Sequence, residues 1–237
     1  MGDETKAVFP ASGTHSHLKN AENFQRLYKE SIEDNEGFWR KMGTELVDWF
    51  SPFSQVNHGD VNSGDVAWYL NGKLNVSYNC LDRHVKNNGD KVAILWEGDE
   101  PGDVVRITYK QLLQDVCKFA NAMKRAGVRK GDSVCLYMPM VPEAAVAMLA
   151  CTRIGAPHSV VFAGFSADAL KDRILDCNCK YVITADEGVR GGRKIPLKAT
   201  TDLALAKCPN VTTCFVFKRT GAKIDWTEGR DIWWHEA

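Results

Sequence analysis

Two arginines flank a pair of glycines in the stretch EGVRGGRKIP (187–196), and this arrangement could hold a phosphate group. Arg190 and Arg193 each carry a planar guanidinium, which can donate paired hydrogen bonds to phosphate oxygens. Gly191 and Gly192 between them would allow the backbone to approach the anion closely. The alternative interpretation is an exposed turn that is never strongly ordered.

The stretch does not match the two most familiar nucleotide-binding patterns. A P-loop needs Gly-Lys followed by Ser or Thr, whereas Lys194 is preceded by Arg193 and followed by Ile195. A dinucleotide fingerprint needs the spacing GxGxxG, whereas these glycines fall at 188, 191 and 192. Any phosphate binding would therefore depend on the two arginines and the backbone between them.

A second candidate is FAGF (162–165), which has an aromatic side chain on each side of a small turn. Phe162 or Phe165 could stack on an adenine ring, and Ala163 and Gly164 would let that ring lie against the main chain. Both phenylalanines could instead be core residues, and for Phe165 we favour the core position.

Three further polar residues near these stretches could do chemistry. His158, in an apolar run after a proline, is better explained as a hydrogen-bonded core histidine than as a general base. Asp186 and Glu187 could be acid catalysts, but ion pairs with the arginines are the favoured interpretation. No Ser-His-Asp or Cys-His constellation is recognisable, so we assign no catalytic residue.

Composition excludes several classes of protein. The 237 residues include 30 basic and 30 acidic side chains, and the zero net charge argues against a nucleic-acid binder. No apolar run approaches the ~20 residues that span a bilayer, and no targeting signal is recognisable, so we expect a cytoplasmic protein. The eight cysteines are expected to be reduced thiols. Cys177 and Cys179 are the one close pair, and their one-residue gap does not fit usual zinc spacing, so no metal site is predicted.

Alternating strands and helices surround both candidate loops. Expected strands cover 133–138, 158–164, 180–185 and 212–218, and expected helices cover 109–126, 142–154, 166–176 and 196–208. This order predicts an α/β fold with a doubly wound, mostly parallel sheet and flanking helices. Ligands of such sheets bind at the carboxyl ends of the strands, where both candidate loops fall.

The residues before this region predict a different organisation. Residues 1–20 are polar and aperiodic and predict a disordered tail, while 21–50 have helical periodicity with a break at 34–37. Residues 51–65 are expected to be a loop. Trp68-Tyr69-Leu70 before Asn71-Gly72 predicts a short hairpin turning at Asn-Gly. We therefore expect three segments: a tail (1–20), a largely helical extension (21–81) and the α/β region (82–237).

Long stretches of the chain resemble the acetyl-coenzyme A synthetase family, which comprises AMP-forming acyl-CoA ligases of the adenylate-forming superfamily. The resemblance is carried by residues 131–174 and by YVITADEGVRGGRKIPLK (181–198), together with YNCLDRHV, ILWEGDEPGD, ITYKQLL and IDWTEGRDIWWHE. It begins near Phe24 and covers nearly all of the chain except the tail.

The resemblance implies a reaction and a role for both loops. Acetate and Mg-ATP would give acetyl-AMP and pyrophosphate, and the thiol of CoA would then displace AMP to form acetyl-CoA. The stretch matching Arg190, Gly191, Gly192 and Arg193 contacts CoA in the family, with the arginines placed to meet its 3′-phosphate. The stretch matching Phe162, Ala163 and Gly164 lies against the CoA adenine.

The resemblance also implies that this chain is the first third of such a ligase. Residues 21–81 would be the family's N-terminal extension, and 82–237 the start of its AMP-binding domain. The family's TSGSTGKPKG-like phosphate loop follows the tryptophan pair matching Trp233 and Trp234, and is not present here. ATP and Mg²⁺ would then serve the full-length enzyme, while this piece contributes to CoA binding and is expected to be inactive alone. Its partners would be acetate, ATP, CoA and the remainder of its own chain.

Two alternatives remain open. The acyl substrate could be propionate, because the residues that shape the acyl pocket would lie after Ala237. A non-catalytic nucleotide-binding or interaction module is the alternative of another class; its docking surface would be the aromatic residues of 21–50.

Overall fold

The computed structural model describes Leu18 and residues 20–237. The predicted tail, 1–20, lies outside the described residues except for Leu18 and Asn20. The chain divides after Lys73 into two compact units, which are described separately. Among the helices of the described chain, none combines the length and the apolar character needed to cross a membrane.

Two capped helices begin the first unit. They are α1 (Ala21–Glu33) and α2 (Asn35–Glu45), which confirm the helical periodicity as far as Glu45. The break consists of Asp34 alone and is shorter than the predicted 34–37. The side chain of Asn20 accepts a hydrogen bond from the backbone of Asn23, and Asp34 does the same for Gly37. Each cap satisfies an amide that has no partner inside its helix, which explains why both helices start where they do.

A β-hairpin completes the first unit, and its turn was predicted wrongly. β1 (Gln55–Asp60) pairs antiparallel with β2 (Asp65–Leu70) across a short 3-10 turn, η1 (Val61–Ser63). The strand before Asn71-Gly72 is therefore paired with the strand that precedes it in the chain, β1, which lies in a segment expected to be a loop. Gly64 has φ +73°, so this residue supplies the left-handed conformation that closes the turn.

The second unit starts with a segment fixed to its body by polar contacts. A π-helical turn, η2 (Tyr78–Asp82), continues into α3 (Arg83–Asn88). Arg153 donates two hydrogen bonds to Asp82, at 2.7 and 2.9 Å. The Asn75 amide donates to the carbonyls of Thr152 and Arg153 at the end of a helix in the body. The Asn75 bonds go to carbonyls in the last turn of that helix, where backbone acceptors have few partners within the helix.

A hairpin and a long helix follow. β3 (Val92–Glu97) and β4 (Val104–Thr108) pair antiparallel and lead into α4 (Tyr109–Arg125). Helix α4 begins with a capping box, in which Thr108 and Gln111 exchange side-chain to backbone hydrogen bonds.

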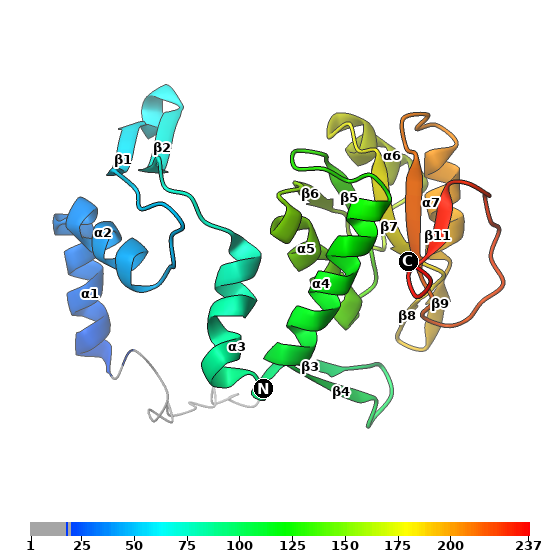
Figure 1. The fold of residues 1–237 in the computed structure, drawn as a ribbon, viewed down its shortest axis with the longest axis horizontal. Coiled ribbons are helices and arrows are strands. Elements are labelled where there is room, and N and C mark those ends of the chain that lie inside the picture. Colours follow the sequence, from blue (N-terminus) through cyan, green and yellow to red (C-terminus); the bar gives the residue numbers. More distant parts are fainter. Residues whose placement is uncertain (1–17, 19) are drawn as a thin grey trace, which may run out of the picture. The chain divides into compact units, whose positions relative to one another are not determined.

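Five parallel strands form the central sheet of the second unit (Figure 1). In chain order they are β5 (Val134–Tyr137), β6 (His158–Val160), β7 (Tyr181–Ala185), β10 (Thr213–Phe217) and β11 (Asp231–Trp233). Across the sheet the order is β11-β10-β7-β5-β6, so the chain runs outward from β5 to β6 and then crosses back to β7. This order confirms the predicted doubly wound sheet.

Helices cover both faces of this sheet. The three that connect successive strands are α5 (Pro142–Ile154), α6 (Ala167–Asp176) and α7 (Leu197–Leu205). Right-handed crossovers put helices on opposite faces when the winding direction reverses. Accordingly α6 packs with α7, and α5 packs with α4 (Figure 1).

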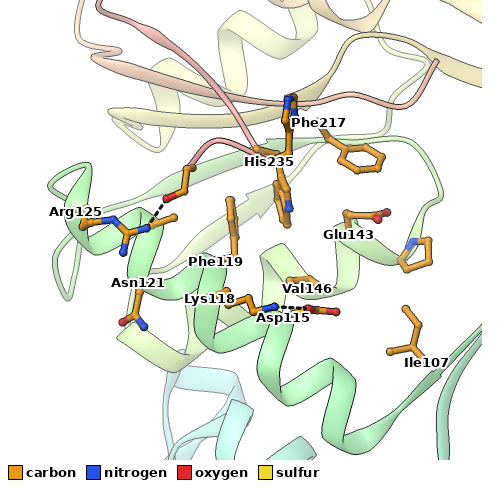
Figure 2. A pocket seen from close by; sticks show the side chains of 14 residues that line it. Ile107, Asp115, Lys118, Phe119, Asn121, Arg125, Glu143, Val146, Phe217 and His235 are labelled. Carbon is orange, nitrogen blue, oxygen red and sulfur yellow. Dashed lines mark hydrogen bonds and ion pairs between the residues drawn. The ribbon is translucent and has the colours of Figure 1, made fainter. Parts of the chain in front are cut away.

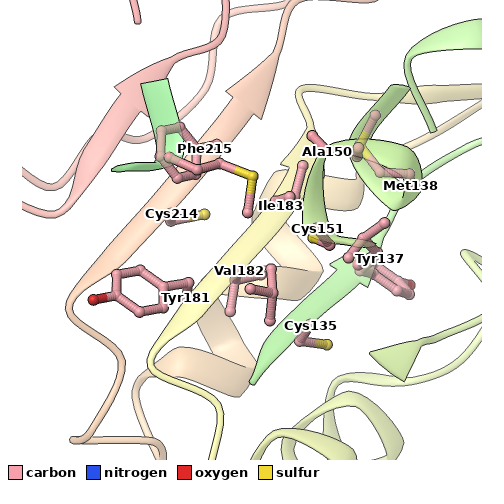
Figure 3. Packing of buried hydrophobic residues seen from close by; sticks show 14 of the residues in the cluster. Cys135, Tyr137, Met138, Ala150, Cys151, Tyr181, Val182, Ile183, Cys214 and Phe215 are labelled. Carbon is pink, nitrogen blue, oxygen red and sulfur yellow. The ribbon is translucent and has the colours of Figure 1, made fainter. Parts of the chain in front are cut away.

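The core explains why the central strands are continuous apolar runs. β5 and β7 are buried along their whole length, since helices cover both of their faces. Figure 3 shows that side chains of β5, β7 and β10 pack together with those of α5. Cys135, Cys151 and Cys214 belong to this cluster. These thiols act as small hydrophobic residues.

Two strands differ from the sequence-based expectation. β6 ends at Val160, so Phe162 to Gly164 belong to a loop and not to a strand. β11 was not expected; its residues pair with Cys214, Phe215 and Val216 of β10. A three-residue strand is too short to produce a readable alternation.

Candidate functional site

The winding direction of the sheet reverses at β5 and β7, and the loops at their carboxyl ends surround the expected ligand position. The FAGF loop follows β6 at this edge, and the RGGR stretch follows β7. Arg190 brings the two together, because its guanidinium carbon lies 5.7 Å from the centroid of the Phe162 ring. That distance is within the range of a cation–π contact.

The RGGR stretch is a β-hairpin, a more ordered structure than the loop expected from sequence. β8 (Gly188–Arg190) pairs with β9 (Arg193–Ile195), and the turn between them is Gly191-Gly192. These glycines have φ values of +56° and +70°, the left-handed pair of a tight two-residue turn. An added Cβ would meet nothing at either position, so the glycines are needed for the turn geometry itself.

Arg190 and Arg193 lie opposite each other in the hairpin and therefore on one face of it. Both are exposed, and neither forms an ion pair with an acid in the part of the chain that the structure describes. Like charges in directly opposed positions repel. The hairpin tip is thus a concentrated positive charge without an internal counterion, which is a suitable arrangement for an anionic ligand.

Phe162 is 54% exposed beside this tip, as a ligand-stacking residue would be. Phe165 is 45% exposed, so its expected position in the core was wrong. Its ring lies 5.6 Å from that of Phe162 in an edge-to-face arrangement. A Cβ on Gly164 would lie 2.5 Å from the Phe162 ring, so any larger residue there would displace this ring.

The buried Tyr137 fixes the FAGF loop through its hydroxyl, a role that we did not predict from the sequence. Its hydroxyl, at the end of β5, donates to the carbonyl of Phe165 at 2.7 Å. Burial raises the pKa of this phenol, which therefore stays a donor. The sequence feature that could have indicated this role is a tyrosine at the carboxyl end of an otherwise apolar strand.

The predicted pairing of Asp186 and Glu187 with the arginines was wrong. Asp186 is 1% exposed and accepts backbone hydrogen bonds from the loop after β10, residues 219–222. Glu187 accepts from the Thr220 hydroxyl at 2.6 Å and lies 3.7 Å from Lys194. Both acids therefore attach the hairpin base to the β10 loop and leave the arginines unneutralised.

His158 is half-buried on β6, and burial lowers its pKa. The expected hydrogen bond to its imidazole is not found among the described residues. The cysteines are all free, and burial raises the pKa of Cys179 to about 12. In residues 20–237 no group of three or more His, Cys, Asp or Glu side chains could hold a metal ion.

One cavity of the second unit shares no residue with these loops. It has a volume of about 630 Å³ and lies between α4, the start of α5 and the end of β10 (Figure 2). Phe119 and Trp234, stacked with centroids 3.5 Å apart, form an apolar wall. Glu143 lies at its other side, and burial raises the pKa of this carboxyl. The other polar groups of the lining include Asp115 and Lys118, which pair with each other at 3.9 Å, and Arg125, which donates to the carbonyl of Ala237. Because these groups are paired within the chain, we place the candidate site at the hairpin edge.

Comparison with known families covers nearly the whole described chain. Residues 24–80 match the family described as the acetyl-coenzyme A synthetase N-terminus, and residues 81–235 match the AMP-binding enzyme family. The fold is similar to that of acetoacetyl-CoA synthetase from Streptomyces lividans, with a TM-score of 0.81 over 94% of this chain and 33% of that one, at 22% identity.

Curated relatives are much closer in sequence. The chain is 57% identical to acetyl-coenzyme A synthetase of Alkalilimnicola ehrlichii over 91% of its length. It is 58% identical to that of Magnetococcus marinus over 93%, and 56% identical to that of Halorhodospira halophila over 99%. These alignments cover 34–36% of the relatives, so the chain spans about a third of their length. The chain therefore belongs to the AMP-binding enzyme family, within which it is similar to the N-terminal third of acetyl-coenzyme A synthetases.

Proposed function

We propose that this chain is the N-terminal part of an acetate–CoA ligase and that its hairpin edge contributes to the CoA site. The full-length enzyme would join acetate and ATP, with Mg²⁺, to give acetyl-AMP and pyrophosphate, and CoA would then displace AMP. This piece would supply contacts to CoA and no catalytic residue. We expect it to show no ligase activity alone, and acetate-dependent pyrophosphate release by the purified chain would contradict that.

The observation that carries the proposal is the uncompensated arginine pair. Arg190 and Arg193 occupy opposed positions on one hairpin face, without a carboxylate partner among the described residues. A phosphate monoester placed between them would remove their mutual repulsion and accept charge-assisted hydrogen bonds. In CoA, the 3′-phosphate of the ribose is the group of this kind.

The aromatic loop supports the same ligand. Phe162 is half-exposed beside Arg190. An adenine ring could therefore stack on Phe162 while the phosphate on its ribose meets Arg190. Gly164 keeps space for the Phe162 ring, and Tyr137 fixes the loop backbone. Phe162, Ala163 and Gly164 are therefore proposed as the adenine side of the site, and Arg190, Gly191, Gly192 and Arg193 as its phosphate side.

The test is made in the full-length enzyme with Arg193→Ala. Losing a charged phosphate contact costs about 1.5–3 kcal/mol, which predicts a KM for CoA raised roughly 10- to 150-fold with the KM for ATP unchanged. Arg173→Ala, at an exposed position on α6, is the matched control and should change neither constant. Equal losses for CoA and ATP in Arg193→Ala would refute the assignment.

A further inference from the structure

Asp186 occupies the junction between β7, β10 and α7. Its backbone N–H donates to the carbonyl of Phe217 at 2.9 Å, and its own carbonyl accepts from the backbone of Lys198 at 3.2 Å. The main chain is therefore fixed on both sides before the arginine hairpin begins two residues later. These backbone hydrogen bonds do not involve the Asp186 side chain.

The Asp186 carboxylate fills a ring of backbone amides. One oxygen accepts from Glu187 at 2.7 Å and Arg219 at 2.8 Å, and the other accepts from Gly221 at 2.7 Å and Ala222 at 3.2 Å. Successive N–H groups around a left-handed residue form an anion-binding nest, and Gly221 has φ +74°. This nest holds the chain's own carboxylate in place of a ligand.

The charge of Asp186 is balanced by these amides, since no described cation forms an ion pair with it. Backbone dipoles cannot swing away as a lysine or arginine side chain can. The contact is thus a rigid joint between the hairpin base and the β10 loop, and its 1% exposure keeps water from competing.

The hairpin depends on this joint for its position. Glu187, beside Asp186, binds the hydroxyl of Thr220 at 2.6 Å, and Lys194 on the opposite strand lies 3.7 Å from Glu187. Gly188 packs closely, since an added Cβ would lie 3.4 Å from Leu197 and from Pro139. Arg190 and Arg193 are at the far tip, where the described residues offer them no acid, so the base determines where they point.

From this geometry we infer that Asp186 is a positioning residue for the ligand-binding arginines, acting through the hairpin base and the 219–222 loop. Its carboxylate touches no ligand, because its lone pairs are used inside the protein. The inference rests on the proposed function, in which the arginines meet a phosphate of CoA. Positioning groups matter because small displacements of a binding group are costly to ligand orientation.

The experiment is Asp186→Asn in the full-length enzyme. The amide keeps the size of the side chain but loses one acceptor oxygen from the nest, so we expect the KM for CoA to rise about tenfold while the KM for ATP is unchanged. Asp132→Asn is the matched control: this acid also accepts a backbone amide, from Arg129 at 2.7 Å, but it precedes β5 at the opposite edge of the sheet and should leave the KM for CoA unchanged. Gly221→Ala strains the nest from the other side and should reproduce the effect if Asp186→Asn does not fold.

Combining variants separates the two hypotheses. If Asp186 acts through the two arginines, Asp186→Asn adds no further loss of CoA affinity in a background that carries both Arg190→Ala and Arg193→Ala. An undiminished loss there, or an unchanged KM for CoA in both Asp186→Asn and Gly221→Ala, overturns the positioning role while Arg193→Ala still supports the CoA site. If Arg193→Ala itself is not selective for CoA, the proposed function of the hairpin fails, and this inference fails with it.

Discussion

Replacing Lys198 by Met should strongly destabilise the second unit. The ammonium group is fully buried, 2.8 Å from Asp202 and 2.9 Å from Asp231, and it also donates to the carbonyl of Asp225 at 3.0 Å. Arg230 pairs with the same two acids, at 2.6 and 2.7 Å. Two cations and two anions therefore balance in this cluster.

The size of the effect follows from that balance. Methionine keeps most of the apolar stem, so the substitution leaves little cavity but leaves one carboxylate uncompensated. Burial alone would raise the pKa of Asp231, but hydrogen bonds from Arg230 and Lys198 outweigh it and hold this pKa below its usual value. Breaking a buried pair in this way costs about 3–5 kcal/mol, against a total stability of roughly 5–15 kcal/mol.

Urea unfolding of the purified chain, followed by circular dichroism and tryptophan fluorescence, measures this loss. Lys207→Met removes an exposed ion pair with Asp168 of similar length, 3.0 Å, and should cost far less than Lys198→Met because solvent screens the pair. Adding Asp231→Asn to Lys198→Met restores neutrality and should recover part of the loss. A loss below about 1 kcal/mol for Lys198→Met, or additive losses in the double variant, would refute the reasoning.

Two further predictions concern the hairpin turn and the pH dependence of stability. Gly192→Ala should destabilise the chain by about 1–2 kcal/mol, because φ is +70° and the space around it is open, while Gly192→Asn should lose less; equal midpoints in urea for all three proteins would contradict this. The pKa of His158 is lowered by burial, so the unfolded chain takes up this proton at higher pH than the folded chain does. Its contribution is present above about pH 6.5 and is lost as the pH falls below that value, so His158→Asn should flatten the decline in stability between about pH 7 and 5. An unchanged slope in thermal unfolding measured across that range would show that His158 does not contribute.

Local signals in the sequence were sufficient for most elements of the α/β region. The capping box of Thr108 and Gln111, Pro142 in the first turn of α5 and Gly155 at its end all mark helix boundaries through contacts within a few residues. Such signals are readable because the interactions that produce them are local. The hairpin β1–β2 was misplaced for the opposite reason: Asn71-Gly72 is a strong turn signal, and pairing of Gln55 with Leu70 overrode it.

The sequence by itself determined the family, the alternation of strand and helix, and the presence of an arginine pair beside a strand end. The tertiary structure decided what these residues face. It placed Arg190 against Phe162, gave Asp186 the backbone amides of 219–222 in place of an arginine, and exposed Phe165. These contacts join segments about 30 residues apart, so they depend on how the strands are ordered in the sheet, and no periodicity within one segment carries that information.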